Sequence, residues 1–288
     1  MRHYLQPQEI KLTGMTLIHI IVFLATGIVV GFIGGLLGIG GGIILIPVQY
    51  AVFVSAGTPA DTAIKMALGT SLLVVLPIAV SGALRHHGHG AVDWKAATTM
   101  GIISSIASFG ASAMAARLPG AALKIAFGVI VLVSAIRMFS SATLSVEQKP
   151  RSRPWQWMVW ALPIGIISGL FGVGGGFVAI PIMTLALRFR LHEAVGTSLA
   201  MMIFTSLGGV IGYIVNGLGV PNLPAYSIGY VNLLAWLSLS VTSTGMAQVG
   251  AIAAHRVPAK QLRIIFIVLL FYVGLKMLGV FEWLHLPI

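Results

Sequence analysis

Two long apolar runs of this chain are each interrupted by the same glycine-rich pattern. The first copy is GFIGGLLGIGGGIILIPV at residues 31–48, and the second is GIISGLFGVGGGFVAIPI at residues 165–182. Glycine disfavours a helix interior by about 1 kcal/mol relative to alanine, so a glycine run inside an apolar segment marks a helix break or a close backbone approach. One such break in each half predicts a site between the two halves.

The similarity between the halves extends beyond the glycine pattern. The stretch ALGTSLL at residues 67–73 corresponds to AVGTSLA at residues 194–200, and the triplet Arg117-Leu118-Pro119 corresponds to Arg256-Val257-Pro258. The chain is therefore predicted to be an internal duplication. Its expected parts are an N-terminal tail at 1–14, a first transmembrane repeat at 15–139, a basic cytoplasmic linker at 140–154 and a second transmembrane repeat at 155–288.

The composition indicates a membrane protein. Hydrophobic residues make up 58% of the chain and charged residues 8%, whereas soluble domains carry about 25% charged residues. The apolar run that starts at Met15 lasts roughly 40 residues, which as one helix would span ~60 Å against a hydrocarbon core of ~30 Å. The chain must therefore turn within residues 38–42. The absence of cysteine excludes disulfides and thiolate metal sites.

The remaining apolar segments are long enough to cross or enter a bilayer. They are expected at 63–84, 96–116 and 121–139 in the first half, and at 155–187, 194–215, 230–254 and 264–280 in the second. The predicted fold is an all-α polytopic membrane protein. It contains two homologous, inverted repeats of about four to five membrane segments each, with glycine-broken helices.

The loop charges favour inverted over parallel repeats. Residues 216–229 contain no lysine or arginine, whereas the equivalent loop at 85–95 contains both. Because basic loops stay in the cytoplasm, these two loops are expected on opposite sides of the membrane. The basic N-terminal residues Arg2 and Lys11 argue for the parallel alternative. The expected location is the bacterial inner membrane, with several crossings.

The glycine patterns also predict an anion site. Where a helix restarts after a break, its first N–H groups are unpaired and carry the positive end of the helix dipole. Hydroxyl groups nearby could add donors without adding negative charge. The alternative role of these glycines and hydroxyls is close helix packing. The candidate substrate-binding residues are Gly40, Gly41, Gly42, Thr70, Ser71, Gly174, Gly175, Gly176, Thr197, Ser198 and Gln248.

The paired motifs GGLLGIGGGIILIP and SGLFGVGGGFVAIP, each followed by a GTSL element, resemble those of the sulfite exporter TauE/SafE family of bacterial membrane transporters. The resemblance covers about residues 15 to 281. It implies a secondary transporter that exports small sulfur-containing anions, such as sulfite, sulfoacetate or another organosulfonate. It does not determine which anion is carried.

Other functions are less well supported by the residues. The loop histidines His86, His87 and His89 could bind a metal or sense pH, but their glycine-rich loop gives no rigid ligand geometry. A serine hydrolase using Ser168 is disfavoured, since the first half has Gly34 at that position. The main alternative is a channel or carrier for an unrelated anion or a cation. A cation site would call for carboxylates or carbonyl rings, and no acidic residue lies deep in a predicted span.

The expected partners follow from charge and environment. The formal net charge of +11 suits contact between cytoplasmic loops and anionic lipid. The sequence therefore predicts a small anionic substrate and membrane lipid as partners, with no nucleic acid, no cofactor, no metal and no enzymatic activity. A homodimer is left open.

Overall fold

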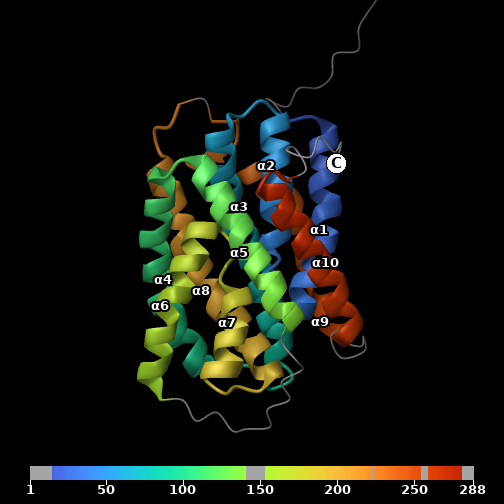
Figure 1. Cartoon of the computed structure of the whole chain (residues 1–288), viewed down its shortest axis with the longest axis vertical. Helices are drawn as coiled ribbons and strands as arrows, with labels where there is room; N and C mark the ends of the chain where they lie inside the picture. The colour runs from blue at the N-terminus through green and yellow to red at the C-terminus, as the bar shows by residue number, and fades with distance from the viewer. Residues whose placement is uncertain (1–14, 141–152, 222, 254–258, 281–288) are drawn as a thin grey trace, which may run out of the picture.

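The computed structural model describes residues 15–140, 153–221, 223–253 and 259–280. They form a bundle of helices that run roughly along its long axis (Figure 1). The first half comprises α1 (Leu17–Leu37), α2 (Gly42–Ser55), α3 (Ala60–His87), α4 (Trp94–Arg117) and α5 (Gly120–Ser140). The second half comprises α6 (Pro154–Phe171), α7 (Gly176–Pro181), the π-helical turn η1 (Ile182–Ala186), α8 (Leu191–Gly217), the hairpin β1 (Ser227–Ile228) and β2 (Val231–Asn232), α9 (Leu233–Ala253) and α10 (Ala259–Met277).

Both predicted helix breaks are present. We call residues 38–41 the first glycine turn and residues 172–175 the second. The glycines with left-handed backbone are Gly38, Gly40 and Gly41 in the first turn, at φ values of 69°, 72° and 73°, and Gly172, Gly174 and Gly175 in the second, at 65°, 73° and 87°. Residues with a Cβ rarely adopt this conformation, which explains why glycine stands at these six positions.

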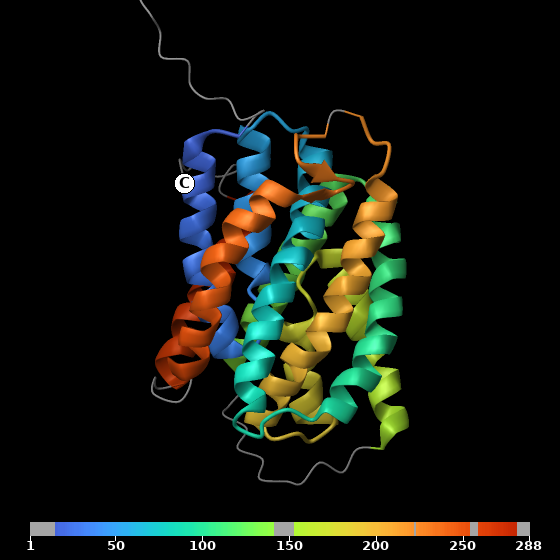
Figure 2. The same ribbon diagram turned by 180° about the vertical axis from the view of Figure 1, so that it is seen from behind.

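The two halves run in opposite directions along the bundle. In Figures 1 and 2, α1 begins at the upper end and α2 returns to it, whereas α6 begins at the lower end and α7 returns there. The helices α3, α4 and α5 then cross the bundle in turn, and α8, α9 and α10 cross it in the reverse sense. An inverted repeat requires these directions. That the halves descend from a duplication stays a prediction from the sequence.

The first helix of each half packs against a helix of the other half. Helix α1 lies against α9, and α6 lies against α4. Glycines make these contacts close: a methyl group on Gly31 would clash with the backbone of Ser243, and one on Gly165 would clash with the backbone of Ser104. Small residues that let two helix backbones approach are typical of membrane helix pairs.

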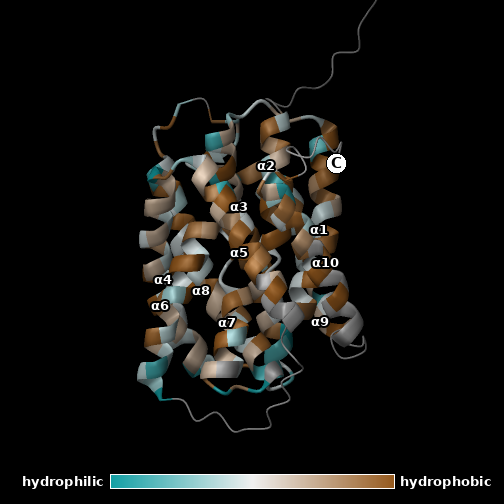
Figure 3. Cartoon of the chain, viewed as in Figure 1, coloured by the Kyte–Doolittle hydropathy of each residue, from teal (hydrophilic) through white to brown (hydrophobic). Residues whose placement is uncertain are grey.

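The outer surface of the bundle suits a lipid environment. In the described part of the chain, four helices, namely α1, α3, α4 and most of α8, are long and apolar enough to cross a membrane. Large apolar side chains face outward, among them Ile18 and Ile106, at 69% and 68% exposure. Hydrophilic residues gather mainly at the two ends of the bundle (Figure 3). The chain is therefore an integral, multi-pass, all-α membrane protein.

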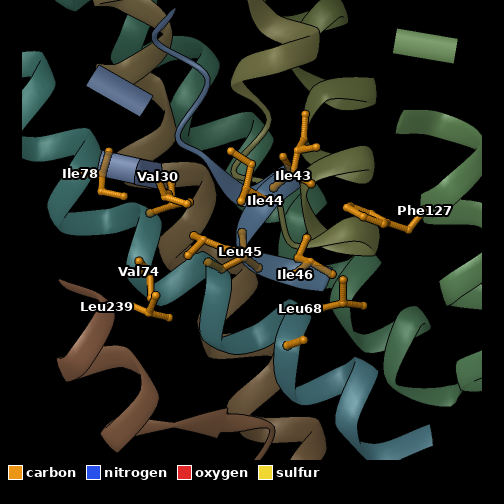
Figure 4. Close-up of a cluster of buried hydrophobic side chains, with 14 of the residues drawn as sticks. Val30, Ile43, Ile44, Leu45, Ile46, Leu68, Val74, Ile78, Phe127 and Leu239 are labelled. Atoms are coloured by element: carbon orange, nitrogen blue, oxygen red, sulfur yellow. The ribbon is translucent and has the colours of Figure 1, made fainter. Parts of the chain in front are cut away.

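The interior is apolar around the helix that follows the first glycine turn. Ile43, Leu45 and Ile46 of α2 are buried, and they lie among side chains from α1, α3, α5 and α9 (Figure 4). Their labelled neighbours are Val30, Leu68, Val74, Ile78, Phe127 and Leu239. This cluster fixes the first glycine turn against α3, which carries the GTSL element.

The halves differ after the glycine turns. Helix α2 continues as an α-helix past Pro47, whereas α7 has six residues and passes at Pro181 into the π-helical turn η1. Proline lacks the amide hydrogen that an interior helical position donates, and π-helical turns are one way to accommodate such a disruption. The loop at 216–229 includes part of the short antiparallel hairpin β1–β2. The tail at 1–14 and residues 141–152 of the predicted linker lie outside the described residues.

Candidate functional site

The two glycine turns contact each other at the centre of the bundle. A methyl group on Gly42 would lie 2.6 Å from the Cα atom of Val173 in the second turn. Reciprocally, a methyl group on Gly176 would lie 2.8 Å from the carbonyl oxygen of Gly38 and 3.0 Å from the Cα atom of Ile39. The predicted meeting of the two glycine patterns between the halves is therefore present, and the lack of side chains is what allows it.

Two side chains, Val75 of α3 and Met202 of α8, occupy the junction of the turns. A methyl group on Gly174 would lie 2.8 Å from Cγ1 of Val75 and 2.9 Å from Cε of Met202, and one on Gly40 would contact the same two side chains. Each follows its GTSL element at the same distance along the chain. Both are fully buried. The junction is thus closed in this structure by one apolar side chain from each half.

The serines of the GTSL elements hold the glycine turns together. The Ser71 hydroxyl donates to the carbonyl oxygen of Gly172 at 2.5 Å. The Ser198 hydroxyl is shared between the carbonyl oxygen of Val195, at 2.9 Å, and that of Gly38, at 3.3 Å. Gly172 and Gly38 are the residues that end α6 and α1, where carbonyl groups lack a helical partner. Each serine therefore caps the broken helix of the other half.

The threonines of the same elements bind the chain at the ends of the bundle. Thr70 Oγ1 accepts the backbone N–H of Asn232 at 3.0 Å, and Thr197 Oγ1 accepts that of Asp93 at 3.0 Å. Asp93 and Asn232 themselves accept an amide hydrogen from the first turn of α4 and α9, respectively. Of the four hydroxyls predicted as anion donors, the two serines thus donate within the protein, whereas the two threonines accept, which does not use their hydroxyl hydrogens.

Two glutamines within the helices, Gln248 of α9 and Gln49 of α2, lie in different environments. Gln248, predicted as a binding residue, is exposed on α9 and does not join the glycine turns. Gln49 of α2 is fully buried, and neither polar atom of its side chain has a hydrogen-bond partner. Sequence reasoning missed Gln49, although it is a lone amide inside the apolar run that contains the first glycine turn. A buried amide without a partner is costly, which makes Gln49 a candidate functional residue.

A second missed residue is Lys65, whose residue exposure is only 7%. Its Nζ atom lies 2.8 Å from Oδ2 of Asp61 and 6.0 Å from the ring centre of Tyr230. The signal for it was a lysine four residues after an aspartate at the start of an apolar segment. Because Asp61 pairs with it, Lys65 presents no isolated positive charge to an anion.

The loop histidines do not converge. His86 is buried at the end of α3, His87 Nδ1 accepts a hydrogen bond from the indole of Trp94, and His89 Nδ1 lies 2.9 Å from the carbonyl oxygen of Arg85. Within the described ranges, no group of three acidic or histidine side chains is arranged to hold a metal ion.

A small cavity opens near this loop, lined by Gly90, Val92, Asp93, Phe189 and Glu193. Its carboxylates cap helices: Asp93 accepts the amide of Ala96, and Glu193 accepts that of Arg190. A cavity with two carboxylates does not suit an anion, so the glycine turns remain the better candidate.

Comparison with known proteins shows the family of the chain. A family model described as "Sulfite exporter TauE/SafE" matches residues 23–277, which include both glycine turns and both GTSL elements. The chain belongs to the sulfite exporter TauE/SafE family. The glycine turns of this TauE/SafE protein are thus part of a membrane transporter.

The names of the relatives agree with transport. A probable membrane transporter protein of Methanocaldococcus jannaschii is 32% identical over 271 residues, covering 93% of this chain and 99% of the relative. Another from Haemophilus influenzae is 28% identical, and the match covers 90% of this chain and 97% of the relative. A third from Bacillus subtilis is 24% identical, and the match covers 91% of this chain and 99% of the relative. No solved structure matches the chain significantly.

Proposed function

We propose that this protein exports small sulfur-containing anions, such as sulfite, sulfoacetate or a related organosulfonate, across the bacterial inner membrane. Membership of the sulfite exporter TauE/SafE family supports the substrate class. The observation that carries the proposal is the contact of the two glycine turns, which brings backbone groups without side chains together between two oppositely directed halves.

The anion would bind to backbone amides at this junction. The carbonyl of Gly41 accepts the first helical hydrogen bonds of α2, from the amides of Ile44 and Leu45. The amides of Gly42 and Ile43 precede these, so they lack an acceptor within the helix and lie at the positive end of its dipole. Each hydrogen bond from a neutral donor of this kind contributes about 0.5–1.5 kcal/mol to the binding free energy. An anion held by a few such bonds can be released as well as bound.

Transport through the junction requires the contact between Val75 and Met202 to open. Methionine has a flexible, unbranched side chain that changes conformation at low cost, so Met202 is the more mobile of the two. Because one glycine hairpin enters from each end of the bundle, opening toward one end and then the other would give alternating access.

The driving force we favour is the membrane potential. An inside-negative potential assists anion export by about 2.3 kcal/mol per charge per 100 mV. This needs no chain of carboxylates through the membrane. The predicted cytoplasmic position of the linker would place the basic loop at 85–95 on the inner side, next to anionic lipid.

A flux assay on the purified protein in lipid vesicles tests this function. Vesicles are loaded separately with sulfite, sulfoacetate, sulfate, chloride or a simple cation, and efflux is measured with and without an imposed inside-negative potential. We expect efflux of sulfite or an organosulfonate that accelerates as the potential grows. Efflux of cations alone, or anion efflux that excludes both sulfite and sulfonates, would favour the channel or unrelated-carrier alternative.

A further inference from the structure

Two buried serines beside the second glycine turn have hydroxyl groups that bind nothing. Ser206 Oγ lies 3.2 Å from the point that a methyl group on Gly174 would occupy, and Ser168 Cβ lies 3.5 Å from the equivalent point on Gly175. Both serines are fully buried, Ser206 on α8 and Ser168 on α6. They therefore flank the same pair of glycines from two different helices.

The lack of a partner distinguishes these serines from most others in the interior. A serine in a helix usually donates to a carbonyl group one turn earlier, as Ser104 and Ser112 do here. Five buried serines in the described part of the chain have no partner, and Ser168 and Ser206 are two of them. A buried donor without an acceptor is unfavourable unless another molecule supplies the acceptor.

The first glycine turn has no equivalent hydroxyls. The positions that correspond to Ser168 and Ser206 are Gly34 and Ala79. The side-chain atoms nearest to the Cβ positions of Gly40 and Gly41 belong to Met202, Val75 and Val30, which are all apolar. The two turns therefore differ in chemistry although they share a backbone shape.

We propose that Ser168 and Ser206 are the side-chain donors to the transported anion, so that the second glycine turn holds the substrate more firmly than the first. This inference rests on the proposed function. Hydroxyls from two different helices suit a ligand with at least two acceptor oxygens on one centre, as in sulfite or a sulfonate. The first turn contributes backbone groups only and acts as the weaker half of the site.

The test compares binding with stability in single variants. Affinity for sulfoacetate is measured by calorimetric titration of the purified full chain, and unfolding temperature is measured on the same samples. We expect Ser168→Ala and Ser206→Ala each to weaken binding by roughly tenfold, since each removes a hydrogen bond to a charged group. Their unfolding temperatures should stay at or above the parental value, because the lost hydroxyl has no partner in the free protein.

Two further variants separate the effect of losing a hydrogen-bond donor from the effect of changing the side-chain volume. Ser206→Cys keeps the side-chain shape with a somewhat larger atom in place of the oxygen but offers a poor donor, so it should weaken binding as Ser206→Ala does. Ser243→Ala removes another buried, unpartnered hydroxyl, on α9 against α1, and should leave affinity unchanged. It is the matched control.

The outcomes distinguish this inference from the proposed function. Parental affinity in both Ser168→Ala and Ser206→Ala would overturn the inference, and vesicle efflux of sulfoacetate by the parent would still support the function. An equal loss of affinity in Ser243→Ala would also overturn it, because the effect would then not be specific to the second turn. A parental protein that neither binds nor moves sulfite or a sulfonate would refute the function itself.

Discussion

The Ser71 hydroxyl donates a hydrogen bond to the carbonyl oxygen of Gly172, the residue at which α6 ends. Ser198 makes the reciprocal contact with Gly38 at the end of α1. These two bonds join each GTSL element to the glycine turn of the other half. They explain why a glycine pattern and a hydroxyl pattern occur together in both halves.

Removing either serine hydroxyl should therefore destabilise the protein. Ser71→Ala leaves the buried Gly172 carbonyl without its donor, which costs about 1–3 kcal/mol. Ser198→Ala should have a smaller effect, since its bond to Gly38 is longer, at 3.3 Å against 2.5 Å. Thermal unfolding in detergent measures the loss of stability in both variants. Ser240→Ala is the control, because that buried hydroxyl has no partner. Equal unfolding temperatures for all three variants would contradict the capping role.

The two ends of the bundle should face opposite sides of the membrane. The chain has no cysteine, so single-cysteine variants need no altered background. Gly88→Cys lies in the loop after α3 at one end, and Leu218→Cys replaces a side chain with 62% exposure at the other. A membrane-impermeant thiol reagent should label Leu218→Cys in intact cells and Gly88→Cys only after permeabilisation.

Labelling of both cysteines from the same side would contradict the inverted arrangement. If Gly88→Cys were labelled in intact cells and Leu218→Cys only after permeabilisation, the repeats would still be inverted, but the protein would have the opposite orientation in the membrane. A periplasm-dependent reporter fused near Ser152, which lies outside the described residues, gives an independent check. It should stay inactive if the basic linker is cytoplasmic.

Replacing Gln49 by methionine should stabilise the fold. The variant Gln49→Met removes two buried polar atoms that have no partner and keeps the side chain's length. Methionine also stands at the corresponding position of the second half, Met183, which is fully buried. We expect a gain of about 1–3 kcal/mol in the free energy of unfolding. A lower unfolding temperature would mean that Gln49 has a partner, such as a bound water or substrate.

Much of the fold could be predicted from the sequence because the relevant signals are local. Apolar length and glycine position gave both helix breaks, and the observed helices agree closely with the expected segments, as with α4 at Trp94–Arg117 against 96–116. Loop charge favoured opposite directions for the halves, and the helices run in those directions. Each of these signals depends on residues that are neighbours in the chain.

The partners of individual polar groups could not be predicted in the same way. The sequence predicted Thr70 and Thr197 as donors but did not reveal that each hydroxyl oxygen accepts an amide from a loop more than 100 residues away in sequence, a contact that does not use the hydroxyl hydrogen. Gln248 and Gln49 are both amides in apolar segments, and only the packing of α9 and α2 decides that the first is exposed and the second buried. Hydrogen-bond satisfaction depends on the tertiary contacts that hydropathy does not contain.

We propose that an anion passes through the junction of the two glycine turns, which Met202 and Val75 close in this structure. The most direct measurement is inactivation of the single-cysteine variant Met202→Cys by a methanethiosulfonate reagent during sulfoacetate efflux from vesicles. Met201→Cys is the matched control, since Met201 is equally buried but belongs to a different apolar cluster. We predict that the reagent stops efflux through Met202→Cys only, and that excess sulfoacetate slows the inactivation. Efflux that is unaffected by modification of Met202→Cys, or inactivation that sulfoacetate does not slow, would contradict the claim.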